Sequence, residues 1–161
     1  TNTLEDRHIL ATFLTRNRDI QYGVDGIEFD KQGNLYVGNF GDGAVYRLRF
    51  ADDGSVKENK VWAQDSGQLK STDGMIMDAE GNLYIADFCA NAVARVAPSG
   101  KVTRIAQSPD TDGLHGELDQ PGEPIIWQGK LVVTCFDLVT GPQMVNTKHE
   151  MPATLSELEP R

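Results

Sequence analysis

The apolar and polar positions of this chain alternate in short runs separated by turn residues. In "AVYRLRF" (residues 44–50), Ala44, Tyr46, Leu48 and Phe50 fall on one face of an extended strand. The runs "GIEF" and "NLYVGNF" (26–29 and 34–40) are rich in β-branched and aromatic residues, and "DKQG" between them is a tight turn ending in Gly. The pattern predicts short antiparallel β-strands and no helix.

This pattern returns at an interval of 48 residues. "VDGIEFDKQGNLYVGNF" (24–40) is followed by "TDGMIMDAEGNLYIADF" (72–88), and the shorter "GKLVVTCF" (129–136) continues the series. A period of this length is typical of stacked or radial β units. The chain is accordingly divided into three repeats and a tail, at approximately 20–67, 68–115, 116–145 and 146–161. The tail is either a strand that closes the ring or an extension over it.

Units of three to four short strands at this spacing predict an all-β fold, a β-propeller of four-stranded antiparallel blades. A parallel β-helix has shorter coils, and a β-sandwich with a coincidental duplication is the other alternative. Propellers close with about four to eight blades, so three blades make half of a six-bladed ring. We expect the ring to be completed either by a missing N-terminal half or by a homodimer about a twofold axis.

The composition argues against two classes of partner, nucleic acids and membranes. The net charge is -9, and no basic run interleaved with aromatic residues suggests a nucleic acid. No apolar run approaches the roughly 18 residues of a membrane span. We expect a soluble protein without nucleic-acid or membrane partners, and its compartment is left open.

An Asp-Gly pair precedes the first apolar run in each of the first two repeats, at Asp25 and at Asp73. In a propeller the equivalent ends of the innermost strands converge on the central channel. Two carboxylates there repel each other unless a cation binds between them. The alternative is that each Asp-Gly only forms a turn.

The stretches "DGIEFDKQGNLYVGNFGDGAVYRL" and "STDGMIMDAEGNLYIADFCANAVARVAPSGKVTRI" resemble the SMP-30/gluconolactonase family of six-bladed propellers, over about residues 20–107 and loosely over 120–140. The resemblance implies one divalent cation in the channel and hydrolysis of a lactone. Asp73 matches the family's "DGM" aspartate, so it is expected to bind the metal and to act as the catalytic base. Asp25, a second expected ligand, falls where the family usually has Asn.

Glu123 is the third expected metal ligand, because "GEPIIWQGKLVV" is similar to the family's first-blade motif of Glu, Pro and Trp. One alignment places Glu123 opposite Asp73 and Trp127 opposite Met77, with a two-residue deletion in the turn. An ungapped alignment places Glu123 opposite Met75. Glu123 is otherwise a glutamate on the rim of the channel.

Four further polar residues are weaker candidates for substrate binding. Asn39 and Asp87 occupy matching strand ends, where they either line the channel or bond a neighbouring blade. His115 and Glu117 lie in the long polar loop 108–124, and loops on rigid scaffolds often contact substrates.

The sequence therefore predicts a metal-dependent, lactonase-like hydrolase acting on a small lactone-type substrate. Calcium is the expected cation and magnesium, manganese or zinc are the alternatives, because oxygen ligands alone do not distinguish calcium from magnesium or manganese. The alternative function is a non-catalytic propeller that binds a small molecule or a protein. Cys89 and Cys135 are expected to be small buried residues, the alternative being a bridge between adjacent blades.

Overall fold

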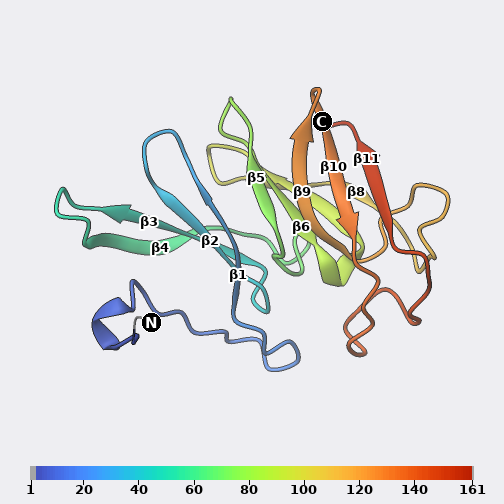
Figure 1. Cartoon of the computed structure of the whole chain (residues 1–161), viewed down its shortest axis with the longest axis horizontal. Coiled ribbons are helices and arrows are strands. Elements are labelled where there is room, and N and C mark those ends of the chain that lie inside the picture. Colours follow the sequence, from blue (N-terminus) through green and yellow to red (C-terminus); the bar gives the residue numbers. More distant parts are fainter. Residues whose placement is uncertain (1–2, 161) are drawn as a thin grey trace.

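The computed structural model describes residues 3–160 and consists of three antiparallel sheets (Figure 1). The first sheet contains β1 (Val24–Phe29), β2 (Leu35–Asn39), β3 (Ala44–Phe50) and β4 (Val56–Gln64). The second contains β5 (Met75–Met77), β6 (Leu83–Asp87), β7 (Ala92–Val96) and β8 (Val102–Gln107). The third contains β9 (Pro121–Trp127), β10 (Lys130–Cys135) and β11 (Thr154–Leu158). The predicted all-β fold is confirmed.

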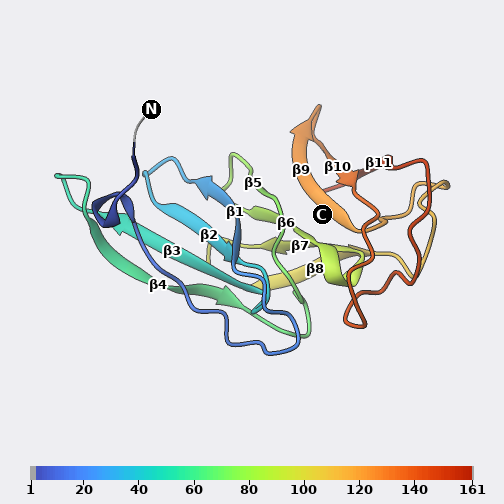
Figure 2. The same ribbon diagram turned by 60° about the horizontal axis from the view of Figure 1, so that its bottom comes forward.

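Each sheet follows the chain order, so every strand pairs with its sequence neighbour. Two single-turn 3-10 helices, η1 (Asp6–His8) and η2 (Phe88–Ala90), are the only helical turns among residues 3–160. The third sheet takes its outer strand, β11, from the predicted tail, where it pairs with β10. The sheets follow one another along an arc, with the N-terminal segment at one end and β11 at the other (Figures 1 and 2).

The repeated sequence "D..GNLY" forms the same hairpin turn twice. Asp30 accepts hydrogen bonds from Asn34 Nδ2 (2.6 Å) and from the Tyr36 hydroxyl (3.2 Å). Asp78 accepts the equivalent bonds from Asn82 Nδ2 (2.8 Å) and the Tyr84 hydroxyl (3.1 Å). This aspartate is therefore structural, because it fastens the turn to the next strand.

The core lies between successive sheets and repeats in the same way. Tyr36 and Val45 of the first sheet pack against the second sheet, and their equivalents Tyr84 and Val93 pack against the third. The opposing residues are Leu83 and Ile85 at the first interface and Leu131 and Val133 at the second. Successive sheets thus pack face to face, which holds their innermost strands side by side.

Candidate functional site

The innermost strands β1, β5 and β9 approach one another closely at their N-terminal ends, and glycine makes the approach possible. A Cβ on Gly26 would lie 2.2 Å from the carbonyl oxygen of Asp73. Gly74 donates its amide to the carbonyl of Gly122 (2.8 Å). Asp25 and Asp73, each followed by one of these glycines, are therefore held at the junctions between sheets.

Both aspartates adopt the same local geometry. Asp25 Oδ1 accepts the amide of Gly26 (2.8 Å), and Asp73 Oδ1 accepts the amide of Gly74 (3.0 Å). Asp25 is exposed, whereas Asp73 is partly buried. The predicted equivalence of the two Asp-Gly pairs is thus seen in the backbone, and their turn geometry leaves Oδ2 of each carboxylate free of the Gly amide.

Glu123 lies at the same junction, on β9. Its Oε2 atom comes 1.9 Å from the position that a Cβ on Gly74 would occupy. Ile126 pairs with Leu131 as Met77 pairs with Leu83, so Glu123 is level with Gly74, one residue beyond Asp73. Neither of the two alignments considered from the sequence describes this register.

The electrostatics link the three carboxylates. The pKa of Asp73 is raised from 3.8 to about 7, first by burial and then by the negative charges of Asp25 and Glu123. The pKa of Glu123 is also raised, first by burial and then by Asp25 and Glu28. Like charges are therefore concentrated where the three innermost strands meet, and a cation would relieve their repulsion.

Glu28 is an acidic residue that the sequence did not single out. A β-bulge at Gly26 leaves Asp25 opposite Gly38 and Glu28 opposite Tyr36, two residues apart on β2, so both side chains point to the same face. Glu28 Oε2 accepts the amide of Met77 (3.4 Å). The sequence did contain a signal for Glu28, because the equivalent position in the next repeat, 48 residues later, is the apolar Ile76.

The donor set fits a hard cation in its chemistry, since carboxylate oxygens are the ligands that Ca²⁺ and Mg²⁺ prefer. Within residues 3–160, however, no three His, Cys, Asp or Glu side chains lie close enough together to hold a metal ion. The carboxylates of residues 3–160 therefore do not form a complete coordination sphere by themselves.

The weaker candidates are held by contacts of their own. Asn39 and Asp87 are fully buried at equivalent strand ends. Asn39 binds Thr15 Oγ1 and the carbonyl of Leu14 (3.0 and 3.2 Å), and Asp87 accepts the amides of Lys70 and Ser71 (both 2.8 Å). Both side chains are therefore occupied in fastening loops to the sheets.

His115 and Glu117 meet each other, because Glu117 Oε2 accepts the amide of His115 (2.9 Å). The carbonyl of Glu117 is bound by Ser156 Oγ (2.8 Å), which places this loop beside β11 rather than beside Asp73. The two cysteines are free and buried, as expected. No helix within residues 3–160 is long and apolar enough to cross a membrane.

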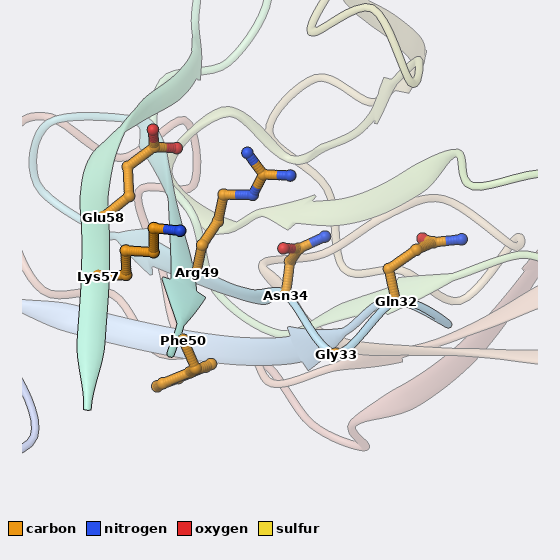
Figure 3. Close-up of a pocket in the computed structure, with 7 residues that line it drawn as sticks. All are labelled: Gln32, Gly33, Asn34, Arg49, Phe50, Lys57 and Glu58. Carbon is orange, nitrogen blue, oxygen red and sulfur yellow. The ribbon is translucent and has the colours of Figure 1, made fainter. Parts of the chain in front are cut away.

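A hollow lies at the opposite end of the first sheet from Asp25. It is open on one side, and basic and polar side chains surround it (Figure 3). Its lining residues are Gln32, Gly33, Asn34, Arg49, Phe50, Lys57 and Glu58. Because Gln32 to Asn34 form the turn after β1, this hollow is separate from the carboxylate junction.

Comparison with known proteins finds a family match over part of the chain. The family model described as SMP-30/Gluconolactonase/LRE-like region matches residues 43–113. The search of curated proteins found no match. Among solved structures, a gluconolactonase from Xanthomonas campestris aligns with a TM-score of 0.64 and 17% identity, over 86% of this chain and 44% of that one. The resemblance predicted from the sequence is confirmed.

Two further structures agree. A luciferin-regenerating enzyme has a TM-score of 0.62 and 14% identity, over 86% of this chain and 46% of that one. Regucalcin from Agrobacterium tumefaciens, a calcium-binding protein, has a TM-score of 0.53 and 23% identity, over 71% and 38%. The chain thus spans less than half the length of these proteins, and its three sheets correspond to about half of a six-bladed propeller. Likeness at such identities establishes the fold alone.

Proposed function

Since the chain contains an SMP-30/gluconolactonase/LRE-like region at residues 43–113, we propose that it forms half of a metal-dependent, lactonase-like hydrolase. The observation that carries the proposal is that Asp25, Asp73 and Glu123 lie at the N-terminal ends of three innermost strands, β1, β5 and β9, which pack against one another in succession. Structural relatives whose names include gluconolactonase and calcium-binding regucalcin support the choice of reaction and cation.

Asp73 is the proposed base. It is the most buried of the three carboxylates, and its pKa of about 7 lies where a group can both accept and release a proton near neutral pH. In the proposed reaction Asp73 takes a proton from water, the water oxygen bonds to the lactone carbonyl carbon, and the ring C–O bond breaks. The departing ring oxygen takes up a proton, which leaves a hydroxy acid.

Asp25 and Glu123 are the proposed partners of Asp73 in holding a divalent cation, with calcium as the expected ion. A bound cation supplies Lewis-acid chemistry. Further ligands would come from the side of the channel opposite these three sheets, because the carboxylates on this chain make only part of a coordination sphere. Asn39, Asp87, His115 and Glu117 are kept as weaker proposals for substrate contacts.

Calorimetric titration of metal-free protein with Ca²⁺ tests the cation, and hydrolysis of a panel of lactones tests the reaction. Asp73→Asn is the test variant, and Glu80→Gln is the matched control, because Glu80 is an exposed acid in a turn. We expect Asp73→Asn to weaken Ca²⁺ binding at least tenfold and to abolish hydrolysis, while Glu80→Gln changes neither. Identical behaviour of the two variants, or hydrolysis unaffected by chelator, would reject the assignment and favour a non-catalytic binding propeller.

A further inference from the structure

The connection between β10 and β11 is far longer than its equivalents in the first two repeats. Residues 40–43 alone join β2 to β3, and residues 88–91 alone join β6 to β7. Residues 136–153, referred to below as the long connection, join β10 to β11. The long connection lies at the edge of the molecule where β1 and β9 begin, which is the edge that carries the carboxylates (Figures 1 and 2).

The long connection reaches back from the third sheet to the second. Val145 donates its amide to the carbonyl of Cys89 (3.1 Å). Lys70 Nζ donates to the carbonyl of Gln143. Because Lys70 lies three residues before Asp73, the long connection contacts the segment that carries the second carboxylate.

The long connection also reaches the first sheet. Met144 packs against the buried cluster that contains Ile20, Phe40 and Phe88. Phe40 and Phe88 follow β2 and β6 directly, and their ring centroids lie 5.9 Å apart. The long connection therefore covers the ends of β2 and β6, beside the starts of β1 and β5, with which these strands pair.

Buried polar contacts hold the long connection in this position. Asn146 is 2% exposed, and its side chain binds those of Asn91 and Asp119, which are also buried. Thr147 Oγ1 donates to Asp110 Oδ2 (2.6 Å). Breaking buried hydrogen bonds is costly, so the long connection is a fixed wall at this edge of the molecule.

A second hollow, of about 310 Å³, lies between the long connection and the segment that precedes β1. Residues 140–144 line one side of it and residues 18–22 line the other. Its two charged lining residues, Arg18 and Asp19, have opposite signs, so the lining carries no net charge. A hollow of this kind suits an uncharged group, which loses little hydration when it enters.

Tyr22 connects this hollow with the carboxylates. Its ring meets that of Phe40 edge-on, with the ring centroids 5.5 Å apart. The Gly41 amide donates to the carbonyl of Tyr22 (3.2 Å), which continues the pairing of β1 with β2 beyond the first residue of β1. Tyr22 precedes Asp25 by three residues of this paired segment, a distance of about 10 Å at the rise of a strand. One small molecule can therefore span the hollow and the carboxylates.

We infer that the hollow between residues 18–22 and 140–144 binds the ring substituent of the substrate, and that the substrate is a lactone with an uncharged alkyl or aryl substituent. This inference rests on the proposed function, because it takes the lactone ring to lie at the carboxylates. Tyr22 and Met144 are the specificity-determining residues, since they offer apolar contacts from the two sides of the hollow. The net charge of -9 and the acidic junction disfavour an anionic substituent.

Hydrolysis of two lactones tests this subsite: γ-butyrolactone has no substituent, and γ-decalactone has a hexyl chain. The wild-type protein should hydrolyse γ-decalactone with the higher kcat/KM. Tyr22→Ala should lower this kcat/KM at least tenfold, mainly through KM, and Met144→Ala should lower it severalfold. Both variants should change kcat/KM for γ-butyrolactone less than twofold. Tyr22→Phe keeps the ring and should behave like the wild type.

Leu138→Ala is the matched control, because Leu138 is an exposed apolar residue of the long connection that does not line the hollow. It should change neither kcat/KM value. Circular dichroism shows whether each variant is folded, and Met144→Ala carries the test if Tyr22→Ala does not fold. Hydrolysis that is equal for the two lactones, or that Tyr22→Ala and Leu138→Ala affect equally, would overturn the subsite and leave the proposed reaction in place.

Calorimetric titration with the hexyl-substituted γ-lactam separates binding from the reaction, since a lactam has no ester bond to hydrolyse. With Ca²⁺ present, the wild-type protein should bind this lactam, and Tyr22→Ala should weaken binding at least tenfold. If this weakening is seen but the wild-type protein hydrolyses no lactone, the proposed reaction fails and the subsite stands. A wild-type protein that does not bind the lactam would overturn the subsite.

Discussion

The side chain of Glu123 lies directly against the α-carbon of Gly74, so that a methyl group on Gly74 would come 1.9 Å from Glu123 Oε2 and 2.6 Å from the carbonyl oxygen of Gly122. Residue 74 must therefore lack a side chain if the second and third sheets are to bring Asp73 and Glu123 together. The Gly of the repeated Asp-Gly pair therefore has two roles: it forms the turn, and it allows two innermost strands to approach each other closely.

Gly74→Ala should consequently destabilise the protein by about 1–3 kcal/mol, because the carbonyl of Gly122 and the carboxylate of Glu123 must both move to admit the methyl group. Urea unfolding measures the loss. Gly23→Ala is the control, since nothing lies within 4 Å of its Cβ position, and it should change the free energy of unfolding by less than about 1 kcal/mol. Equal effects of the two substitutions would show that the contact between Gly74 and Glu123 is not needed.

The raised pKa of Asp73 makes stability depend on pH in a defined direction. A carboxyl whose pKa is about 7 when folded and 3.8 when unfolded holds its proton better in the folded state. The stabilisation of the folded state by this bound proton is present in full below about pH 4 and is lost as the pH rises to about 7. Relative to Asp73→Asn, the free energy of unfolding of the metal-free wild-type protein should fall by about 1–2 kcal/mol between pH 4 and pH 7. The change is smaller than the full pKa shift implies, because Asp73 is partly exposed and solvent screens its charge.

Unfolding in urea at a series of pH values from 4 to 8, with chelator present, measures this difference. The comparison with Asp73→Asn isolates one group, because other carboxyls titrate in the same range. Asp119, whose pKa is raised to about 6 by burial and by the charge of Asp137, is one of these, and the pKa of Asp87 is raised as well. Parallel pH profiles of the two proteins would contradict the assigned coupling among Asp25, Asp73 and Glu123.

Asp87 and Asn39 provide a test of structural against functional use. Asp87 is 0% exposed, accepts two backbone amides and pairs with Arg104 (3.5 Å), whereas the first repeat has neutral Asn39 at the same place. Asp87→Asn should cost about 3 kcal/mol or more, because the side-chain amide cannot accept from both backbone groups and leaves Arg104 without its partner. Thermal unfolding measures the cost.

The control for Asp87→Asn is Asp53→Asn, since Asp53 is an exposed turn aspartate that bonds Ser55. It should lower the free energy of unfolding by no more than about 1 kcal/mol. If instead Asp87→Asn preserved stability and altered hydrolysis or ligand binding, Asp87 would belong with the substrate contacts proposed from its position at the strand end.

Sequence periodicity was sufficient for the strands of the first two sheets and for the equivalent positions of Asp25 and Asp73. The alternation in residues 44–50 and the equal spacing of Asp25 and Asp73 each depend on neighbours in the chain, so they are visible without a structure. Glu28 was missed because the bulge at Gly26 changes which side chains share a face, and a bulge of this kind leaves little trace in the sequence.

The third sheet shows the other limit of the sequence. The register of Glu123 depends on the turn between β9 and β10, and neither alignment anticipated that Ile126 would face Leu131. β11 comes from a segment in which the repeat is no longer visible, and it forms because β10 offers a free edge. Pairing between distant segments decides both features, and local patterns do not record it.

A divalent cation should reverse the pH dependence of the carboxylate junction. Ca²⁺ at one hundred times its dissociation constant stabilises the state that binds it by about 2.7 kcal/mol, and it competes with protons for Asp73. The Ca²⁺-induced rise in melting temperature should therefore be larger at pH 8 than at pH 5, and it should be small at both in Asp73→Asn. Glu80→Gln is the matched control, and NaCl at equal ionic strength corrects for screening. A rise that is equal at both pH values, or that persists in Asp73→Asn, would place the cation elsewhere and separate Asp73 from metal binding.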